Sequence, residues 1–292
     1  MVVNARPTTN RRTREVAVLT LLLGLSASMA LSTPARAAEA TGAKGIACEA
    51  ADAAAINQFI AAEGAKSSTD GQIAAKLKER WCGLTEIGSP ALDGIQARTS
   101  QSDVDWSDMS MFYDGQARVY VATATWKWTR QGFLDADTVI CANNNIGGFD
   151  GLGIRFSGGD MNILGKAATA WGNPAKDSYS NDYGFTAVPH SQVGEYGVGF
   201  RLQDRATKLK SSTGACTNGQ YDYNMFGGSA TITFKALNAC KNVQMYPGYI
   251  HTWDNTSVNT IGAGPYSFSI GWTSNGADWT KEENGPSARI CP

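Results

Sequence analysis

The sequence predicts a mainly β protein: an antiparallel β-sandwich, or a barrel-like domain, preceded by a small helical hairpin. Three observations support this prediction. Apolar residues recur with helical spacing before residue 84, they alternate with polar residues after residue 105, and pairs of turn-forming residues interrupt the alternating region. Alternation collects the apolar side chains on one face of a sheet, which must be buried against a second layer.

Residues 1–37 are typical of a secretory signal peptide. Arginines precede an apolar segment at 16–31, and Ala35-Arg36-Ala37 fits the small-residue pattern before a cleavage site. The apolar segment has 16 residues, fewer than the ~20 that span a bilayer. We therefore expect a secreted, extracellular protein with no membrane span in the mature chain.

Residues 38–83 are predicted to form the helical hairpin. Apolar side chains three or four positions apart mark its two helices: Ile56, Phe59 and Ile60 in the first, and Ile73, Leu77 and Trp81 in the second. Thr69 followed by Gln72 fits a capping box at the second start. Residues 84–104 lack this spacing and are predicted to be a linker, which leaves residues 105–292 for the β-sandwich.

Hairpin turns are predicted at four pairs of turn-forming residues: Asp114-Gly115, Gly158-Gly159, Gly227-Gly228 and Asn275-Gly276. The flanking strands alternate clearly. Trp126 and Trp128 share one strand face with Tyr120 and are predicted to be core.

All the cysteines follow the predicted cleavage site, and their even number indicates three disulfides. They are Cys48, Cys82, Cys141, Cys216, Cys240 and Cys291. Closeness along the chain favours the pairs Cys48–Cys82 and Cys216–Cys240, which leaves Cys141 with Cys291. No C-x-x-C spacing occurs, so zinc and thioredoxin-type redox chemistry are disfavoured.

Charge argues against two classes of partner. Removing residues 1–37 leaves 20 basic and 25 acidic residues, a net charge near −5. A mildly acidic chain without a Lys/Arg cluster is unsuited to nucleic acid or to anionic lipid. We expect no nucleic-acid partner, and a monomer.

An aromatic row is the leading candidate for a ligand site. In an extended strand Tyr249, His251 and Trp253 share one face, and each combines a flat apolar body with a polar tip. Such side chains can stack on the apolar face of a sugar and bond to its hydroxyls. Tyr183 and His190, in a nearby aromatic loop, could rim the same site. The alternative is that the row packs in the core.

No catalytic residue is assigned. The chain lacks a G-x-S-x-G elbow, and His251 and Asp254, three apart on a strand, would point to opposite faces without a bulge. A hydrolase with paired carboxylates remains an alternative, and its densest candidates are Asp103, Asp105 and Asp108.

No metal or cofactor is assigned either. Asp103, Asp105, Ser107 and Asp114 match positions 1, 3, 5 and 12 of a calcium loop, but Asp108 stands where that loop requires glycine. A solvated strand entrance is the favoured interpretation of this acidic stretch.

Four segments together resemble secreted β-rich proteins of actinobacteria whose function is unassigned: Trp126-x-Trp128, "DGLGIRFS", "GYIHTWDNTSVN" and "SFSIGWTSNGADW". The resemblance covers residues 105–283, includes no catalytic motif, and implies secretion and a β-rich fold. We therefore expect a secreted, non-catalytic binding module for polysaccharide or cell-envelope glycan. The alternatives are a secreted glycoside hydrolase and a secreted effector, a toxin or inhibitor that acts on a foreign cell or protein.

Overall fold

The computed structural model describes residues 48–66, 68–88, 104–129, 144–172, 185–210, 213, 216–253, 256–274 and 277–292. These residues belong to one compact unit, Ile46–Pro292, so the helices do not form a separate domain. The predicted signal at 1–37 lies outside them. No helix among them is long and apolar enough to cross a membrane.

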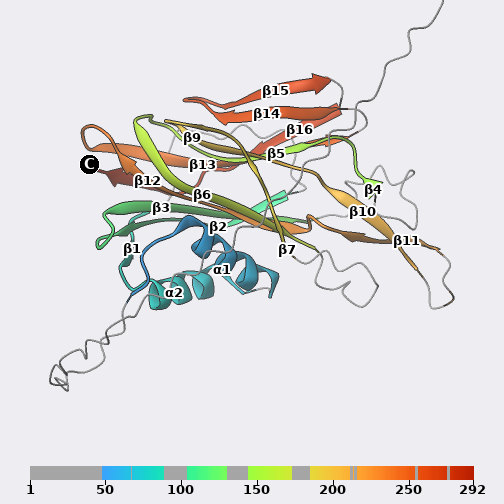
Figure 1. Cartoon of the computed structure of the whole chain (residues 1–292), viewed down its shortest axis with the longest axis horizontal. Coiled ribbons are helices and arrows are strands. Elements are labelled where there is room, and N and C mark those ends of the chain that lie inside the picture. Colours follow the sequence, from blue (N-terminus) through green and yellow to red (C-terminus); the bar gives the residue numbers. More distant parts are fainter. Residues whose placement is uncertain are drawn as a thin grey trace, which may run out of the picture. The chain divides into compact units, whose positions relative to one another are not determined.

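The described part of the chain begins with two helices and continues in strands, which confirms the predicted fold class (Figure 1). The helices are α1 (Ala53–Ala65) and α2 (Asp70–Arg80). The strands are β1 (Leu84–Glu86), β2 (Val104–Asp114), β3 (Val119–Trp128), β4 (Asn144–Asn145), β5 (Asp150–Phe156), β6 (Met161–Trp171), β7 (Phe185–Ala187), β8 (His190–Gly194), β9 (Gly197–Leu202), β10 (Arg205–Lys210), β11 (Cys216–Tyr223), β12 (Gly227–Ala236), β13 (Lys241–Trp253), β14 (Ser257–Ala263), β15 (Phe268–Ser274), β16 (Ala277–Glu282) and β17 (Ser287–Ile290).

Two antiparallel sheets pack face to face. Sheet 1 has the order β1-β2-β3-β12-β6-β7, and sheet 2 has the order β16-β13-β5-β9-β8, with β17 paired to the start of β13. Their facing side chains form the main core, which includes Trp126, Ile154, Phe156, Phe200 and Phe234, all nearly inaccessible to solvent. The predicted burial of the Trp126–Trp128 face is correct, because those indoles face sheet 2.

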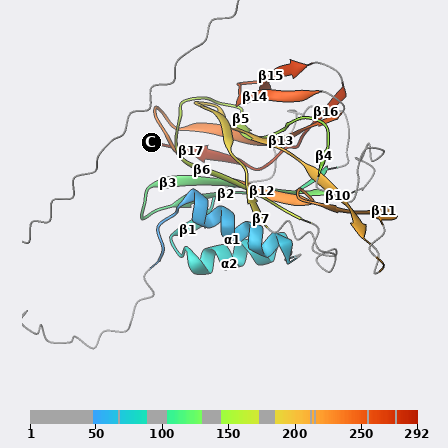
Figure 2. The ribbon, with the colours of Figure 1, turned by 45° about the vertical axis from the view of Figure 1, so that its right-hand side comes forward.

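The helices cover the outer face of sheet 1 (Figure 2). Their apolar stripes pack on Phe112 and Val121, which point away from the main core. Asn57 of α1 adds polar contacts, since its amide donates to the Ser229 hydroxyl at 3.0 Å and accepts from the Thr169 hydroxyl at 2.7 Å. The hairpin is therefore one layer of the β domain.

The predicted linker at 84–104 needs correction at its start. Leu84–Glu86 form β1, which pairs with the end of β2 and places Leu84 in the cluster beneath the helices. Strand propensity alone did not indicate so short an edge strand. Residues 89–103 lie outside the described residues.

A small sheet of β14 and β15 covers the outer face of sheet 2. Ile250 of β13 packs there against Val258, Ile261 and Phe268. Gly153 and Gly248 pair across β5 and β13, and a Cβ atom at either would lie 2.2 to 2.3 Å from the Phe268 ring. These glycines leave room for an aromatic ring instead of marking a solvent-facing side, so β5 and β13 are buried on both faces.

Only the first of the four predicted hairpins joins paired strands. Asp114-Gly115 connects β2 to its partner β3, whereas Gly158-Gly159 connects β5 of sheet 2 to β6 of sheet 1. Gly227 and Gly228 lie inside β12, where a Cβ atom on Gly228 would meet the Trp126 ring at 1.9 Å. Residues 275–276 lie outside the described residues, and the strands flanking them belong to different sheets. A pair of turn-forming residues therefore does not identify the pairing partner, and at Gly227-Gly228 it does not mark a turn.

One of the three predicted disulfides is confirmed and the other two are wrong. Cys48–Cys82 forms as predicted, across the helical hairpin. Cys240 pairs with Cys291, so the predicted Cys216–Cys240 and Cys141–Cys291 bridges are wrong. The reason is the antiparallel pairing of β13 with β17, which brings Lys241 opposite Ile290 and so places the two flanking cysteines together. Cys141 lies outside the described residues, as does the side chain of Cys216.

Candidate functional site

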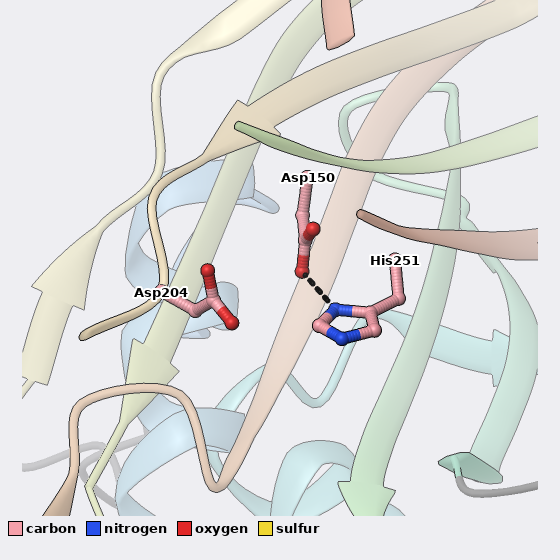
Figure 3. A group of neighbouring side chains, drawn as sticks. All are labelled: Asp150, Asp204 and His251. Atoms are coloured by element: carbon pink, nitrogen blue, oxygen red, sulfur yellow. Dashed lines mark hydrogen bonds and ion pairs between the residues drawn. The ribbon is translucent and has the colours of Figure 1, made fainter. Parts of the chain in front are cut away.

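The candidate site centres on Asp150, the first residue of β5, whose side chain is fully buried. Its Oδ2 accepts a hydrogen bond from the Tyr249 hydroxyl at 2.8 Å and lies 3.0 Å from His251 Nδ1 (Figure 3). Its Oδ1 accepts from the Thr252 backbone N–H at 2.7 Å and from the Thr252 hydroxyl at 3.2 Å. One carboxylate of β5 thus holds three residues of β13.

The register of sheet 2 explains this convergence. Ile250 of β13 lies opposite Gly151 of β5, so His251 is one step beyond that pair and comes level with Asp150. His251 is only 1% exposed, and its ring lies among aromatic rings, with centroids 5.1 Å from Trp128 and 5.5 Å from Trp279. Burial and the nearby carboxylates raise the pKa of Tyr249, so its hydroxyl keeps the proton that it donates to Asp150.

Asp204 completes a cluster of three buried side chains with Asp150 and His251. It lies between β9 and β10 and is 4% exposed, yet neither of its carboxylate oxygens accepts a hydrogen bond from another described residue. Burial first, and then the neighbouring Asp150, raise its pKa well above the usual aspartate range. One donor atom from each of Asp150, Asp204 and His251 falls within 4.8 Å of the others. Two carboxylates and an imidazole could hold a divalent cation.

A pocket of about 260 Å³ lies beside this cluster, since Phe149 lines it next to Asp150 in the chain, and Gln203 and Arg205 line it on either side of Asp204. Its other lining residues are Thr186, Ala187, Val188, Pro189, Arg201, Leu202, Asn224 and Met225. The pocket therefore shares its supporting strands and connections with the buried cluster.

Two guanidinium groups reach the pocket. The Arg201 guanidinium lies 4.2 Å from the centroid of the Phe149 ring and donates to the Asn259 carbonyl at 2.9 Å. Arg205 Nε donates to Asn145 Oδ1 at 3.2 Å. Neither arginine forms an ion pair with a carboxylate of the described residues. The pocket consequently carries positive charge in a chain that is acidic after loss of its predicted signal.

The structure changes the interpretation of the predicted aromatic row. Tyr249 and His251 are core residues on the inner face of sheet 2, so they offer no exposed stacking surface, and only Trp253 is partly exposed. His190 is exposed at the start of β8, next to pocket residue Pro189, but does not line the pocket. Tyr183 lies outside the described residues. The predicted row is not a ligand-binding surface at Tyr249 and His251, because β13 lies inside sheet 2 and is covered on both faces.

The acidic residues singled out in the sequence do not assemble into a site. Asp105, Ser107 and Asp114 lie along the single strand β2, which is too extended to wrap a calcium ion. Asp114 instead accepts backbone hydrogen bonds from Ala51, Gln116 and Ala117, at 2.8 to 3.0 Å. Asp105 is exposed and Asp108 is buried, whereas Asp103 and Asp254 lie outside the described residues.

Sequence reasoning missed Asp150 and Asp204. Asp150 follows a Gly-Gly-Phe turn and Asp204 follows a clean alternation, so both resembled ordinary residues at strand ends. The partner of His251 lies 101 residues away in the chain, and no local pattern indicates such a contact. Comparisons add no external guide, because no protein-family model matches the chain and no curated protein is significantly similar to it.

Proposed function

We propose that the protein is an exported, non-catalytic binding module that recognises a polysaccharide or cell-envelope glycan carrying anionic sugars. The pocket at Phe149, Arg201 and Arg205 would accept one acidic sugar unit. The observation that supports this most is the pair of guanidinium groups at one pocket, neither of which has a carboxylate partner in the described part of the chain. Guanidinium groups bind carboxylates and phosphates through paired hydrogen bonds, which favours uronic acid or phosphate-bearing units.

Three further features support the proposal. Phe149 is 36% exposed and provides an aromatic edge at the pocket, as expected for sugar contact. The disulfides Cys48–Cys82 and Cys240–Cys291, together with the signal-like residues 1–37, support export to an oxidising compartment. Burial of Asp150 and Asp204 supports binding over hydrolysis, because a glycosidase must bring its carboxylates to the substrate.

The test compares acidic and neutral polysaccharides. In affinity electrophoresis we expect polygalacturonate to retard the protein and neutral dextran not to, with no release of reducing sugar. Arg201→Gln and Arg205→Gln should each weaken binding roughly tenfold, since each removes charge-assisted hydrogen bonds. Arg289→Gln, an exposed arginine of β17 outside the pocket, is the matched control and should bind as wild type.

Two outcomes would contradict the proposal. Equal retardation by both polysaccharides, unaffected by the Arg201 and Arg205 variants, would remove the anionic-sugar pocket. Steady release of reducing sugar that Asp150→Asn abolishes would replace the binding module with the hydrolase alternative.

A further inference from the structure

We propose that Asp150, Asp204 and His251 bind one divalent transition-metal ion, with zinc the expected occupant, which ties the β9–β10 connection to the centre of sheet 2. Their donor atoms, one from each residue, lie within 4.8 Å of one another. This site goes beyond glycan recognition and does not depend on it, because none of its three residues lines the pocket.

The carboxylate of Asp204 is the first argument. It is 4% exposed and has two oxygens that accept no hydrogen bond from another described residue. Buried polar groups almost always have partners, and an exception calls for an explanation such as a bound ion. Figure 3 shows this carboxylate pointing toward the Asp150–His251 pair. A cation bound between the three side chains would supply the missing partner.

Charge balance is the second argument. Asp150 and Asp204 are both buried, and among the described residues no lysine or arginine forms an ion pair with either of them. The buried Arg155 is already paired with Glu282 at 2.7 Å. Two carboxylates in a low-dielectric interior are costly unless an opposite charge compensates them. A divalent ion bound by both carboxylates would supply this opposite charge.

The donor set favours a transition metal over calcium or magnesium. Those two ions prefer all-oxygen sites, whereas an imidazole nitrogen with carboxylates suits zinc and its neighbours. Two donor atoms on a tetrahedral zinc ion lie about 3.3 to 3.6 Å apart, given bonds of about 2.0 to 2.2 Å. The donor atoms here lie within 4.8 Å of one another, so the widest pair must close by up to about 1.5 Å on binding. Asp150 also keeps its hydrogen bonds from Tyr249 and Thr252, which fix its orientation.

The experiment measures metal content and metal-dependent unfolding of the full exported protein. Elemental analysis of the purified protein, followed by chelation and readdition of zinc, manganese or calcium, is expected to give one zinc per chain. Zinc at a hundredfold excess over its dissociation constant should raise the unfolding midpoint by about 5 °C or more, and calcium should leave it unchanged.

Asp204→Asn separates a metal site from a plain hydrogen-bonded cluster. In chelator this variant should be about as stable as wild type, because the amide has nearly the shape of the carboxyl and that carboxyl has no hydrogen-bond partner among the described residues to lose, yet it should lose the zinc-dependent rise. Asp105→Asn, on an exposed residue of β2, should keep the rise. A wild-type protein that carries no metal and responds to none of the three ions would overturn the proposal. An Asp204→Asn variant with the full zinc response would overturn it too, since zinc would then bind elsewhere.

Discussion

The carboxylate of Asp150 and the imidazole of His251 lie 3.0 Å apart although 101 residues separate them in the chain. The same carboxylate accepts hydrogen bonds from the Tyr249 hydroxyl and the Thr252 backbone. Since these groups are buried in sheet 2, the loss of one contact leaves a buried polar group without its partner. The stability of the protein should therefore depend strongly on this one acidic side chain.

Asp150→Ala should lower the free energy of unfolding by about 3 to 5 kcal/mol, because it leaves several buried donors without an acceptor. Urea unfolding followed by tryptophan fluorescence measures this cost. Asp105→Ala, at an exposed position of β2, should change stability by no more than about 0.5 kcal/mol. Equal, small effects at both positions would show that Asp150 does not hold β13.

Two tyrosines of β13 offer a matched comparison of a paired and an unpaired hydroxyl. Both side chains are buried, but the Tyr249 hydroxyl donates to Asp150, whereas the Tyr246 hydroxyl has no hydrogen-bond partner among the described residues. Tyr249→Phe should cost about 1.5 to 3 kcal/mol, and Tyr246→Phe should be neutral or stabilising. Urea unfolding of both variants checks this, and the reverse order would contradict the assigned hydrogen bond.

Gly248 should tolerate no larger side chain while Phe268 is present. A Cβ atom there would lie 2.2 Å from the Phe268 ring, so Gly248→Ala should destabilise the protein by about 1 to 3 kcal/mol. In a Phe268→Ala background the same change should cost much less, because the ring is gone. A double-mutant cycle, measured by chemical unfolding, gives the coupling free energy between the two substitutions. Additive effects would mean that the Phe268 ring does not cover Gly248.

Glu63 should make the free energy of unfolding depend on pH. Its hydrogen bonds with Lys76, Lys66 and Ser68 lower the pKa of this carboxyl from 4.5 to about 2. Because the folded-state pKa is depressed, the stabilisation is present above pH 4.5 and is lost as the pH falls toward 2.

Glu63→Gln should therefore cost about 1 kcal/mol at pH 7, a modest value because the lysine partners are exposed and screened. When urea unfolding is measured across the pH range, the free energies of unfolding of the variant and the wild type should become equal as the pH approaches 2. Glu79→Gln, at an exposed position of the neighbouring helix, is the control and should show no such trend. A deficit that stays constant across the pH range would contradict the assigned ion pairs.

The disulfide pattern can be read directly by mass spectrometry of a non-reducing digest. We expect peptides linking Cys48 to Cys82 and Cys240 to Cys291. Replacing both Cys240 and Cys291 by serine should cost about 3 to 4 kcal/mol, since the bridge closes a loop of 51 residues. A peptide linking Cys216 to Cys240 would contradict this assignment.

The sequence predicted what depends on local pattern. Helical spacing located both helices, alternation located the strands of the main core, and closeness along the chain identified Cys48–Cys82. It failed wherever the answer depends on which strand lies beside which. The predicted hairpin at Gly158-Gly159 joins two sheets, and Cys240 meets Cys291 only because β17 returns to β13.

The candidate site shows the same limit more sharply. The sequence singles out His251 as an exposed member of an aromatic row, whereas the structure buries it, because alternation cannot distinguish the inner face of a central strand from a solvent-facing one. Its neighbours Asp150 and Asp204 come from a strand start and a connection that carry no distinctive motif. The register between β5 and β13 brings Asp150 level with His251. The pairing of β5 with β9, in which Asp150 lies opposite Leu202, brings Asp204 near both.

The central position of β5 also bears on how the chain reaches its native state. Its two partners, β9 and β13, both follow it in sequence, and β13 begins at Lys241, long after β5 has ended at Phe156. Such non-local pairing must close long loops before any core contact compensates the lost entropy, and it slows folding. We expect refolding on the millisecond-to-second scale typical of all-β domains. Until β13 has paired with β5, the unpaired edge of β5 can pair with another chain, which favours aggregation.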